Sequence, residues 1–333
     1  MVVTVAADSI IRPASRRSSM AHYLLKHEAV GVSTRALGVV HNERRRRRDP
    51  RMSRTSSINP GIVALSLLGV CGVMLTAQTP PVPPTNVRVV AAYPTASTTG
   101  VPPGVELTPS GSITISTAGA VVSGLDISGT VNINANDVTL KNSRIRSNAF
   151  YVVRVQAGRS GVVIQDSEID GVGTDNAGNH GIAGGPATVR RCNIHHVENG
   201  ITPQSGGWLI EDNYIHTLLA SGSPHYDGIQ IDGGISNITI RHNTVINQHN
   251  QTAAVMIDNY FGPISNIVVD NNRLVGGGYT VYSDGQFSGG TISGVSFTNN
   301  RLGRGYWGYA SIVRNTPVWT GNLDDVTGAP VSR

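Results

Sequence analysis

A recurring alternation of apolar and polar positions is the strongest pattern in this chain. Seven segments share an eight-residue frame with apolar residues at the first, third and eighth positions and mostly polar residues between. The frames begin at Val138, Val162, Ala187, Trp208, Ile238, Ile267 and Val295. Period-two alternation predicts half-buried β-strands. Because the repeat returns every 21 to 30 residues without a helical stretch, it predicts the coils of a solenoid.

The sixth position of the frame holds small or amide side chains. Its occupants are Ser143, Ser167, Cys192, Asn213, Asn243, Asn272 and Asn300. Asn tolerates left-handed backbone angles, and stacked Asn side chains can hydrogen-bond to one another and to the backbone of a tight turn. Four Asn in register therefore predict a ladder. We interpret Cys192, in the same column, as a small buried filler and not as a nucleophile.

This pattern resembles the pectate-lyase-like superfamily over about residues 105–320. The resemblance implies an all-β, single-stranded right-handed parallel β-helix of about 7–9 coils, each with three strands and with the Asn ladder between the second and third. It implies variable loops at 146–150, 170–179, 195–198, 216–226, 246–252 and 275–278. It implies first strands that begin around Tyr151, His180, Asn199, Asp227, Ala253 and Tyr279. The substrate groove of the superfamily follows the first-strand face beside those loops.

The domain organisation follows from the flanking segments. Residues 1–51 read as a disordered or non-native extension, with Met52 a candidate start, and 52–78 as a secretory signal, because an Arg-rich stretch precedes the apolar run 62–75. An uncleaved anchor is the alternative, although the run is short for a membrane span. The Pro-rich segment 79–104 is expected to be a linker or cap, 105–320 the β-helix domain and 321–333 a C-terminal tail. We therefore expect a secreted protein.

Charge and cysteine content narrow the class of partner. The net charge of +5 arises from the leader, because residues 79–333 hold fourteen Lys and Arg but seventeen Asp and Glu. That distribution argues against a nucleic-acid partner. The chain has only Cys71 and Cys192, so after removal of a signal there is no disulfide partner. We expect a monomer that binds a polysaccharide.

Candidate ligand-binding residues come from the register of the first strands. Taking Val153, Ile182, Ile201, Ile229, Val255 and Val281 as inward residues places the next positions outward. Arg154, Gln204 and Gln230 then face the groove as substrate-binding candidates. Asp232, Asp258 and Asp284 form a file on successive coils. Since close like charges are costly, such a file predicts either a Ca²⁺ site or a carboxyl group with a raised pKa beside an ionised one.

Histidine and tyrosine residues gather near the same face. All seven histidines after residue 78 lie between His180 and His249, and His can act as acid or base near neutral pH. The candidate catalytic residues are His225, Tyr226, Asp227 and Tyr282, and the further substrate-binding candidates are His216, Tyr260 and Tyr279. Gly228 is expected to let a ligand approach the strand closely.

The resemblance and these residues predict a polysaccharide lyase that cleaves an acidic, uronic-acid polymer by β-elimination. In that scheme the aspartate file holds Ca²⁺, His225 is the base, and Tyr226 or Tyr282 is the acid. A lysine base is excluded, because Lys141 is the only lysine after residue 26 and lies on a second strand. A glycoside hydrolase with two of the carboxylates and a non-catalytic, tailspike-like glycan-binding protein stay open as alternatives.

Overall fold

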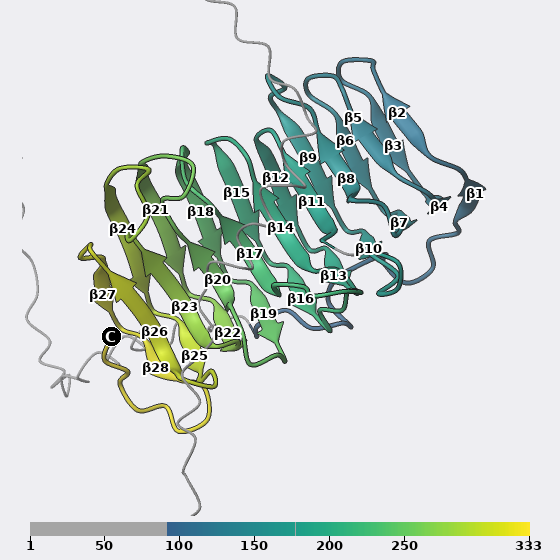
Figure 1. Cartoon of the computed structure of the whole chain (residues 1–333). Helices are drawn as coiled ribbons and strands as arrows, with labels where there is room; N and C mark the ends of the chain where they lie inside the picture. The colour runs from purple at the N-terminus through teal and green to yellow at the C-terminus, as the bar shows by residue number, and fades with distance from the viewer. Residues whose placement is uncertain (1–91, 177) are drawn as a thin grey trace, which may run out of the picture. The chain divides into compact units, whose positions relative to one another are not determined.

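The computed structural model describes residues 92–176 and 178–333. The expected extension and signal segments, and the first part of the expected linker, lie outside the described residues. Among the residues described, the secondary structure consists of strands and turns without an α-helix, and no helix is available there that could span a membrane. Figure 1 follows the strands coil by coil from β1 to β28.

The strands form three parallel sheets, and every third strand along the chain joins the same sheet. The first sheet contains β2 (Ile113–Ile115), β5 (Val131–Ile133), β8 (Tyr151–Val155), β11 (His180–Gly184), β14 (Asn199–Pro203), β17 (Asp227–Ile231), β20 (Ala253–Ile257), β23 (Tyr279–Asp284) and β26 (Gly308–Val313). The second contains β3 (Val121–Ser123), β6 (Thr139–Lys141), β9 (Val162–Gln165), β12 (Ala187–Arg190), β15 (Trp208–Glu211), β18 (Ser236–Arg241), β21 (Ile264–Asp270), β24 (Ile292–Thr298) and β27 (Val318–Thr320). The third contains β1 (Thr108–Ser110), β4 (Leu125–Ser128), β7 (Arg144–Arg146), β10 (Glu168–Asp170), β13 (Asn193–His195), β16 (Tyr214–His216), β19 (Thr244–Asn247), β22 (Arg273–Gly276), β25 (Arg301–Gly303) and β28 (Leu323–Asp324).

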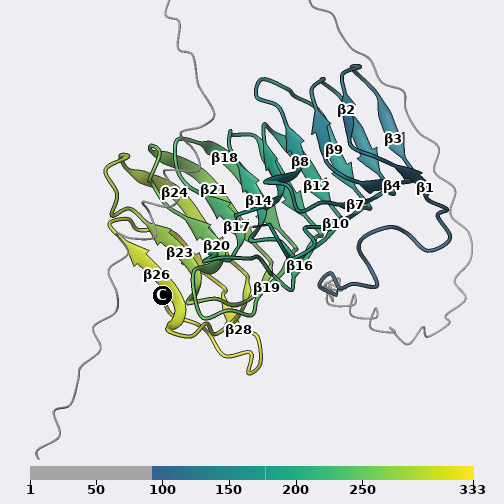
Figure 2. The ribbon, with the colours of Figure 1, turned by 45° about the vertical axis from the view of Figure 1, so that its right-hand side comes forward.

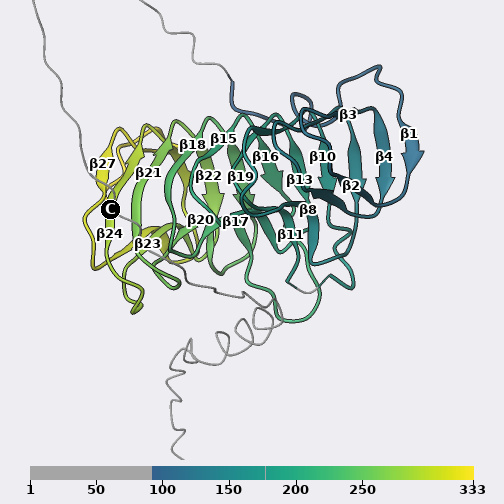
Figure 3. The same ribbon diagram turned by 90° about the horizontal axis from the view of Figure 1, so that it is seen from above.

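This topology is that of a parallel β-helix, as the repeat predicted, with about eight turns. Figures 2 and 3 show the same coils from two further directions, with the strands of each sheet side by side along the stack. The first strands begin at the six residues expected from the sequence, from Tyr151 to Tyr279. Each third strand ends at or just after the residue where a variable loop was expected to begin.

The core lies inside the coils and consists of stacked aliphatic columns. In the first sheet, backbone pairing aligns Val153, Ile182, Ile201, Ile229, Val255 and Val281. All six side chains are fully buried, which confirms the register predicted for the first strands. Because each such side chain contributes about 1.5–3 kcal/mol on burial, these columns hold successive coils together.

The amide ladder at the turn between the second and third sheets is also confirmed. Asn213 donates to Asn243 Oδ1 at 2.9 Å, Asn243 to Asn272 at 3.0 Å, and Asn272 to Asn300 at 3.0 Å. Asn322 adds a further rung, since Asn300 donates to its Oδ1 at 3.0 Å. Cys192 is fully buried in the same column, and its backbone N–H donates to Asn213 Oδ1 at 3.0 Å.

The left-handed residue of this turn is the fifth of the frame and not the sixth. The positive φ angles fall on Asn142, Asp166, Arg191, Asp212, His242, Asn271 and Asn299, between 50° and 58°. The sixth residue provides hydrogen bonds, whereas the fifth reverses the chain. The left-handed angle, which Asn tolerates, thus falls on the residue before each ladder position.

Both flanking segments pack on the coils where they are described. Tyr93 stacks on His242 with ring centroids 5.5 Å apart, and its hydroxyl donates to Asn271 Oδ1 at 3.4 Å. At the other end, Trp319 Nε1 donates to the carbonyl of Val331 at 2.7 Å. The β-structure extends to Asp324, into the segment expected as a tail.

Candidate functional site

The outer face of the first sheet presents the polar columns expected from the sequence. Backbone pairing aligns Arg154 with Ala183 and Thr202, and Gln230 with Met256. Beyond them lie Asp232, directly after β17, Asp258, directly after β20, and Asp284, the last residue of β23. These three aspartates, which we call the acidic file, occupy the edge where the chain leaves the first sheet for the second.

The structure brings the members of the acidic file into register. Asp258 and Asp284 form a parallel bridge, and Ile231 pairs with Ile257 immediately before Asp232 and Asp258. Neighbouring strands of a sheet lie about 4.8 Å apart, so each carboxyl group has a like charge on the next coil. The lateral alignment predicted for these residues is present.

Burial and neighbouring charges raise the pKa of two aspartates in this region, Asp258 and Asp227. Burial, followed by the charges of Asp232 and Asp284, raises the pKa of Asp258 to about 8, against the lowering influence of the Tyr260 N–H, which donates to Asp258 Oδ1 at 2.9 Å. Asp227, at the start of β17, is 2% exposed. Burial and then the charge of Asp232 raise the pKa of its carboxyl group well above the ordinary value. Asp258 is therefore largely protonated at neutral pH.

Among the described residues, the three carboxyl groups of the acidic file do not all have ligand atoms within 4.8 Å of one another. Within the described ranges, the group of three or more ligating side chains whose ligand atoms all lie within 4.8 Å of one another is a different one. Asp284 Oδ1 also accepts the N–H of Gln286 at 3.1 Å, and its second oxygen accepts the Gln286 amide. The six to eight oxygen ligands of Ca²⁺ can include backbone carbonyls and waters as well as carboxylates, so binding of Ca²⁺ at the acidic file stays a prediction.

Two of the other catalytic candidates lie near the acidic file, because the charge of Asp232 acts on Asp227 and Tyr282 precedes Asp284 by two residues on β23. His225 and Tyr226 precede β17, whereas Asp232 follows it. The Tyr226 ring stacks on His249 at a centroid distance of 3.6 Å, and its hydroxyl donates to the carbonyl of Ala220 at 3.3 Å. Tyr226 is 6% exposed and Tyr282 only 2%. Both rings are largely buried, and their role as the acid stays a prediction.

Gly228 also has a role in packing. A Cβ at this position would lie 2.1 Å from Val245 Cγ1, which belongs to the third sheet. The absence of a side chain therefore lets two sheets approach each other inside the coil. The expectation that Gly228 opens the strand to a ligand is wrong.

Two of the substrate-binding candidates, Arg154 and Gln204, lie on early coils of the first sheet. The Arg154 guanidinium carbon is 4.6 Å from the centroid of the Tyr151 ring, and the buried Arg154 Nε has no protein partner. Gln204 is exposed and donates to the Tyr151 hydroxyl at 3.2 Å. Further along the face, the buried Oε1 of Gln230 also has no protein partner. Such orphaned polar atoms are the groups that a polar ligand satisfies.

Aromatic side chains border the later coils. Tyr260 contacts Phe261 edge-on at 4.8 Å, and Tyr279 lies 5.8 Å from Trp307. Phe261 is 52% exposed and Trp307 is 50% exposed. Tyr260 and Tyr279 thus each contact an exposed aromatic side chain. The sequence did not point to Trp307, because this residue lies outside the repeated frame. Exposed rings of this kind offer flat apolar surfaces.

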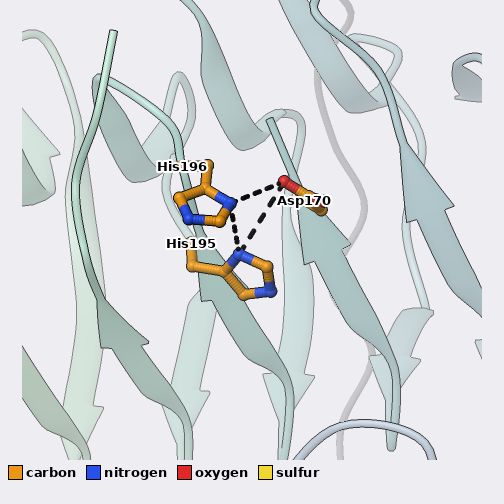
Figure 4. A group of neighbouring side chains, drawn as sticks. All are labelled: Asp170, His195 and His196. Carbon is orange, nitrogen blue, oxygen red and sulfur yellow. Dashed lines mark hydrogen bonds and ion pairs between the residues drawn. The ribbon is translucent and has the colours of Figure 1, made fainter. Parts of the chain in front are cut away.

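A histidine cluster lies at the edge where the third sheet leads to the first. Asp170, His195 and His196 bring their ligand atoms within 4.8 Å of one another (Figure 4). His195 ends β13 and His216 ends β16, so these histidines stand at strand ends and not in loops. Burial, together with the charges of His195 and His196, lowers the pKa of His216 to about 4. Sequence reasoning noted these histidines but missed Asp170, whose pairing with His195 follows from the repeat register.

The comparisons agree with this architecture at the level of the fold. Residues 123–318 match the family described as the right handed beta helix region. The comparisons with curated proteins and with solved structures give no match. Because the matched segment covers more than half of the sequence, this chain belongs to the right-handed β-helix family.

Proposed function

We propose that this protein is an exported polysaccharide hydrolase that binds a glycan chain along the outer face of the first sheet. The observation that carries the proposal is the position of Asp258, between Asp232 and Asp284 on adjacent coils and with its pKa raised to about 8. Hydrolysis of a glycosidic bond needs one protonated and one ionised carboxyl group. Two carboxyl groups whose surroundings push their pKa values apart supply this pair.

In this proposal Asp258 is the general acid and a neighbouring aspartate is the nucleophile or base. Adjacent coils lie about 4.8 Å apart, close to the separation of about 5 Å between the two carboxyl groups of retaining enzymes. The proposal therefore predicts retention of the anomeric configuration. The alternative pair, Asp232 with Asp284, spans two coils or about 9.6 Å, just beyond the separation of about 6.5–9.5 Å that inversion requires.

Binding is assigned to the groups on the same face. Gln230 lies two residues before Asp232. Its Oε1 would accept a hydrogen bond from a sugar hydroxyl, because this atom has no protein donor. The exposed rings of Phe261 and Trp307 are assigned to stacking on sugar faces. The export signal proposed for 52–78 would deliver the protein to extracellular glycans.

Elimination on a uronic-acid polymer is the second candidate function. The observation that favours it is the pair Arg154 and Tyr151, with the guanidinium over the ring and its Nε unpaired. An arginine can neutralise the C5 carboxylate of a uronate. A tyrosine hydroxyl can give its proton to the departing oxygen and take the C5 proton in its place. This centre lies three coils before Gln230, so it is separable from the acidic file by mutation.

The two functions differ in products and in the residues they need. The full chain would be incubated with neutral glycans and with uronans, with and without Ca²⁺, and assayed for new reducing ends and for the ultraviolet absorbance of an unsaturated uronide. Reducing ends without absorbance support hydrolysis. Absorbance that persists in Asp258→Asn and is lost in Arg154→Gln supports elimination. Glycan retention without any product would reject both and leave a binding protein.

A further inference from the structure

We propose that Asp170, His195 and His196 form a binding site for one divalent first-row transition-metal ion of the Zn²⁺ type. His195 Nδ1 and His196 Nδ1 are 3.0 Å apart, and Asp170 Oδ1 lies 3.0 Å from His196 Nδ1 and 3.7 Å from His195 Nδ1. Ligands bonded to Zn²⁺ at about 2.0–2.1 Å in a tetrahedron are separated by about 3.3–3.4 Å. The three atoms thus span a triangle of the required size, and they point toward one another in Figure 4.

The coil repeat builds this triangle. Asp170 ends β10 and pairs with His195 at the end of β13, so their side chains leave adjacent strands at the same level. His196 follows with φ of 53°, a left-handed angle that reverses the chain and brings the second imidazole beside the first. Gly171 permits the close approach, because a Cβ there would lie 2.3 Å from the carbonyl oxygen of His196.

The hydrogen bonds that the three ligand atoms make with surrounding groups leave lone pairs that face one another. His195 Nε2 is 3.2 Å from Glu168 Oε1, and a neutral imidazole that donates there presents a lone pair at Nδ1. Asp170 Oδ1 is an acceptor that already takes the Val172 N–H at 2.8 Å. A single proton on His196 Nδ1 would have to serve both neighbours. A cation at the centre satisfies all three atoms at once.

The surroundings match those of metal ligands. A ligating histidine usually donates its other ring N–H to a carboxylate, which fixes the tautomer and the ring orientation. Glu168 is placed to accept this bond from His195. Arg146 Nε donates to Asp170 Oδ2 at 3.0 Å, so the second oxygen of Asp170 is occupied and Oδ1 is left to face the two rings.

The ligand set also selects the class of ion. Imidazole nitrogen suits Zn²⁺ and other first-row divalent ions, whereas Ca²⁺ and Mg²⁺ prefer oxygen ligands. The adjacent His216 does not supply a fourth ligand as placed, since its Nδ1 bonds to Thr217 Oγ1 at 2.7 Å and its Nε2 to Asn193 Oδ1 at 2.9 Å. The His196 side chain is 36% exposed, so the ion can enter from solvent and a water molecule can complete the tetrahedron.

The test is a Zn²⁺ titration of the full chain after treatment with a chelator, by calorimetry and by elemental analysis of the dialysed protein. We expect saturable binding of one Zn²⁺ per chain and a rise in Tm when Zn²⁺ is present. His196→Asn keeps a residue suited to the left-handed angle and removes one ligand, so it should weaken Zn²⁺ binding by about 100-fold or more. Glu168→Gln should weaken it by about 10–100-fold.

His242→Asn is the matched control. His242 has φ of 52° and its Nδ1 bonds to Asp212 Oδ1 at 2.6 Å, a pairing like that of His196 with Asp170 but without a second imidazole. Zn²⁺ affinity should be unchanged in this variant. Asp170→Asn provides a second ligand variant, and the Tm measured without metal separates misfolding from loss of a ligand. Absence of stoichiometric Zn²⁺ binding, or equal affinity in His196→Asn and the unmodified protein, would overturn the proposal. The site is independent of glycan cleavage, so either proposal can fail alone.

Discussion

Asp258 and Asp284 form a parallel bridge at the ends of adjacent strands of the first sheet, which sets two carboxyl groups side by side on consecutive coils. In a β-helix, equivalent positions of successive coils lie side by side. Acidic residues at equivalent positions therefore form a row of like charges. Burial, and then the charges of Asp232 and Asp284 on the two neighbouring coils, raise the pKa of Asp258. The proposed acid therefore depends on the regularity of the fold.

The raised pKa of Asp258 predicts a pH-dependent stability. The unfolded carboxyl group loses its proton near pH 4, whereas the folded one holds it to about pH 8. Stability should therefore fall as pH rises between these values, because the folded state binds more protons there. Asp258→Asn should be more stable than the unmodified protein by at least about 1 kcal/mol at pH 8, with the difference vanishing below pH 4. Urea denaturation across this range measures the effect.

Asp324→Asn supplies a control of opposite sign. Hydrogen bonds from Thr327 lower the pKa of Asp324 to about 2, so its contribution is present above the unfolded pKa and is lost as the pH falls toward 2. This variant should be less stable than the unmodified protein at neutral pH. A pH-independent effect of Asp258→Asn would contradict the assigned coupling.

The amide ladder should carry a measurable part of the stability. Asn243 donates to the carbonyl of Ile210 at 2.9 Å and to Asn272, and accepts the Asn213 N–H at 3.0 Å, all in a buried turn. Asn243→Ala leaves these groups unsatisfied and should cost about 2–3 kcal/mol. Asn250→Ala changes an exposed amide and should stay within about 0.5 kcal/mol. Equal denaturation midpoints would show that the ladder contributes nothing.

The thiol of Cys192 should be inert while the protein is folded. It is fully buried, and burial raises its pKa to about 12. A thiol reagent needs the thiolate and access to it. In a Cys71→Ser background, which leaves one thiol, labelling should occur only at the rate of unfolding and become immediate in denaturant. Rapid labelling of the native protein would contradict the burial of this column.

Arg154 should contribute to glycan binding. Its Nε is buried without a protein partner on the proposed binding face, so Arg154→Gln should weaken glycan affinity by about tenfold or more, equivalent to about 1.5 kcal/mol. Arg190→Gln is the control, because Arg190 lies on the second sheet and its Nε donates to Gln165 at 2.9 Å. Affinity electrophoresis with a glycan that the protein binds compares the two. An equal loss of glycan affinity in the two variants would contradict the assignment of Arg154 to the binding face.

The sequence predicted those features that repeat from coil to coil. The inward columns, the strand starts from Tyr151 to Tyr279 and the in-register acidic file follow from the repeated frame together with the three-strand coil that the resemblance to a β-helix superfamily implies. A register error of one residue would have turned every side chain to the other face. Ile229 and Asp258 lie where this reasoning placed them.

The features that depend on contacts between loops could not be predicted in this way. Tyr226 lies before a strand of the first sheet, but its burial results from stacking on His249, which belongs to the next variable loop. Gly228 is required by the position of Val245 on another sheet. The role proposed for Asp170, at the end of a third-sheet strand, depends on two adjacent imidazoles that the turn at His196 brings together.

The most direct test of the proposed hydrolysis is the rate of reducing-end release by Asp258→Asn, measured on the best substrate of the panel and compared with Asp212→Asn in a turn between the second and third sheets. Loss of a general acid should lower the rate by about 10²–10⁴-fold, whereas Asp212→Asn should retain the rate of the unmodified protein. Activity of the unmodified protein should also fall as the pH rises through about 8, where Asp258 loses its proton. A folded Asp258→Asn variant with undiminished hydrolysis would contradict the assignment.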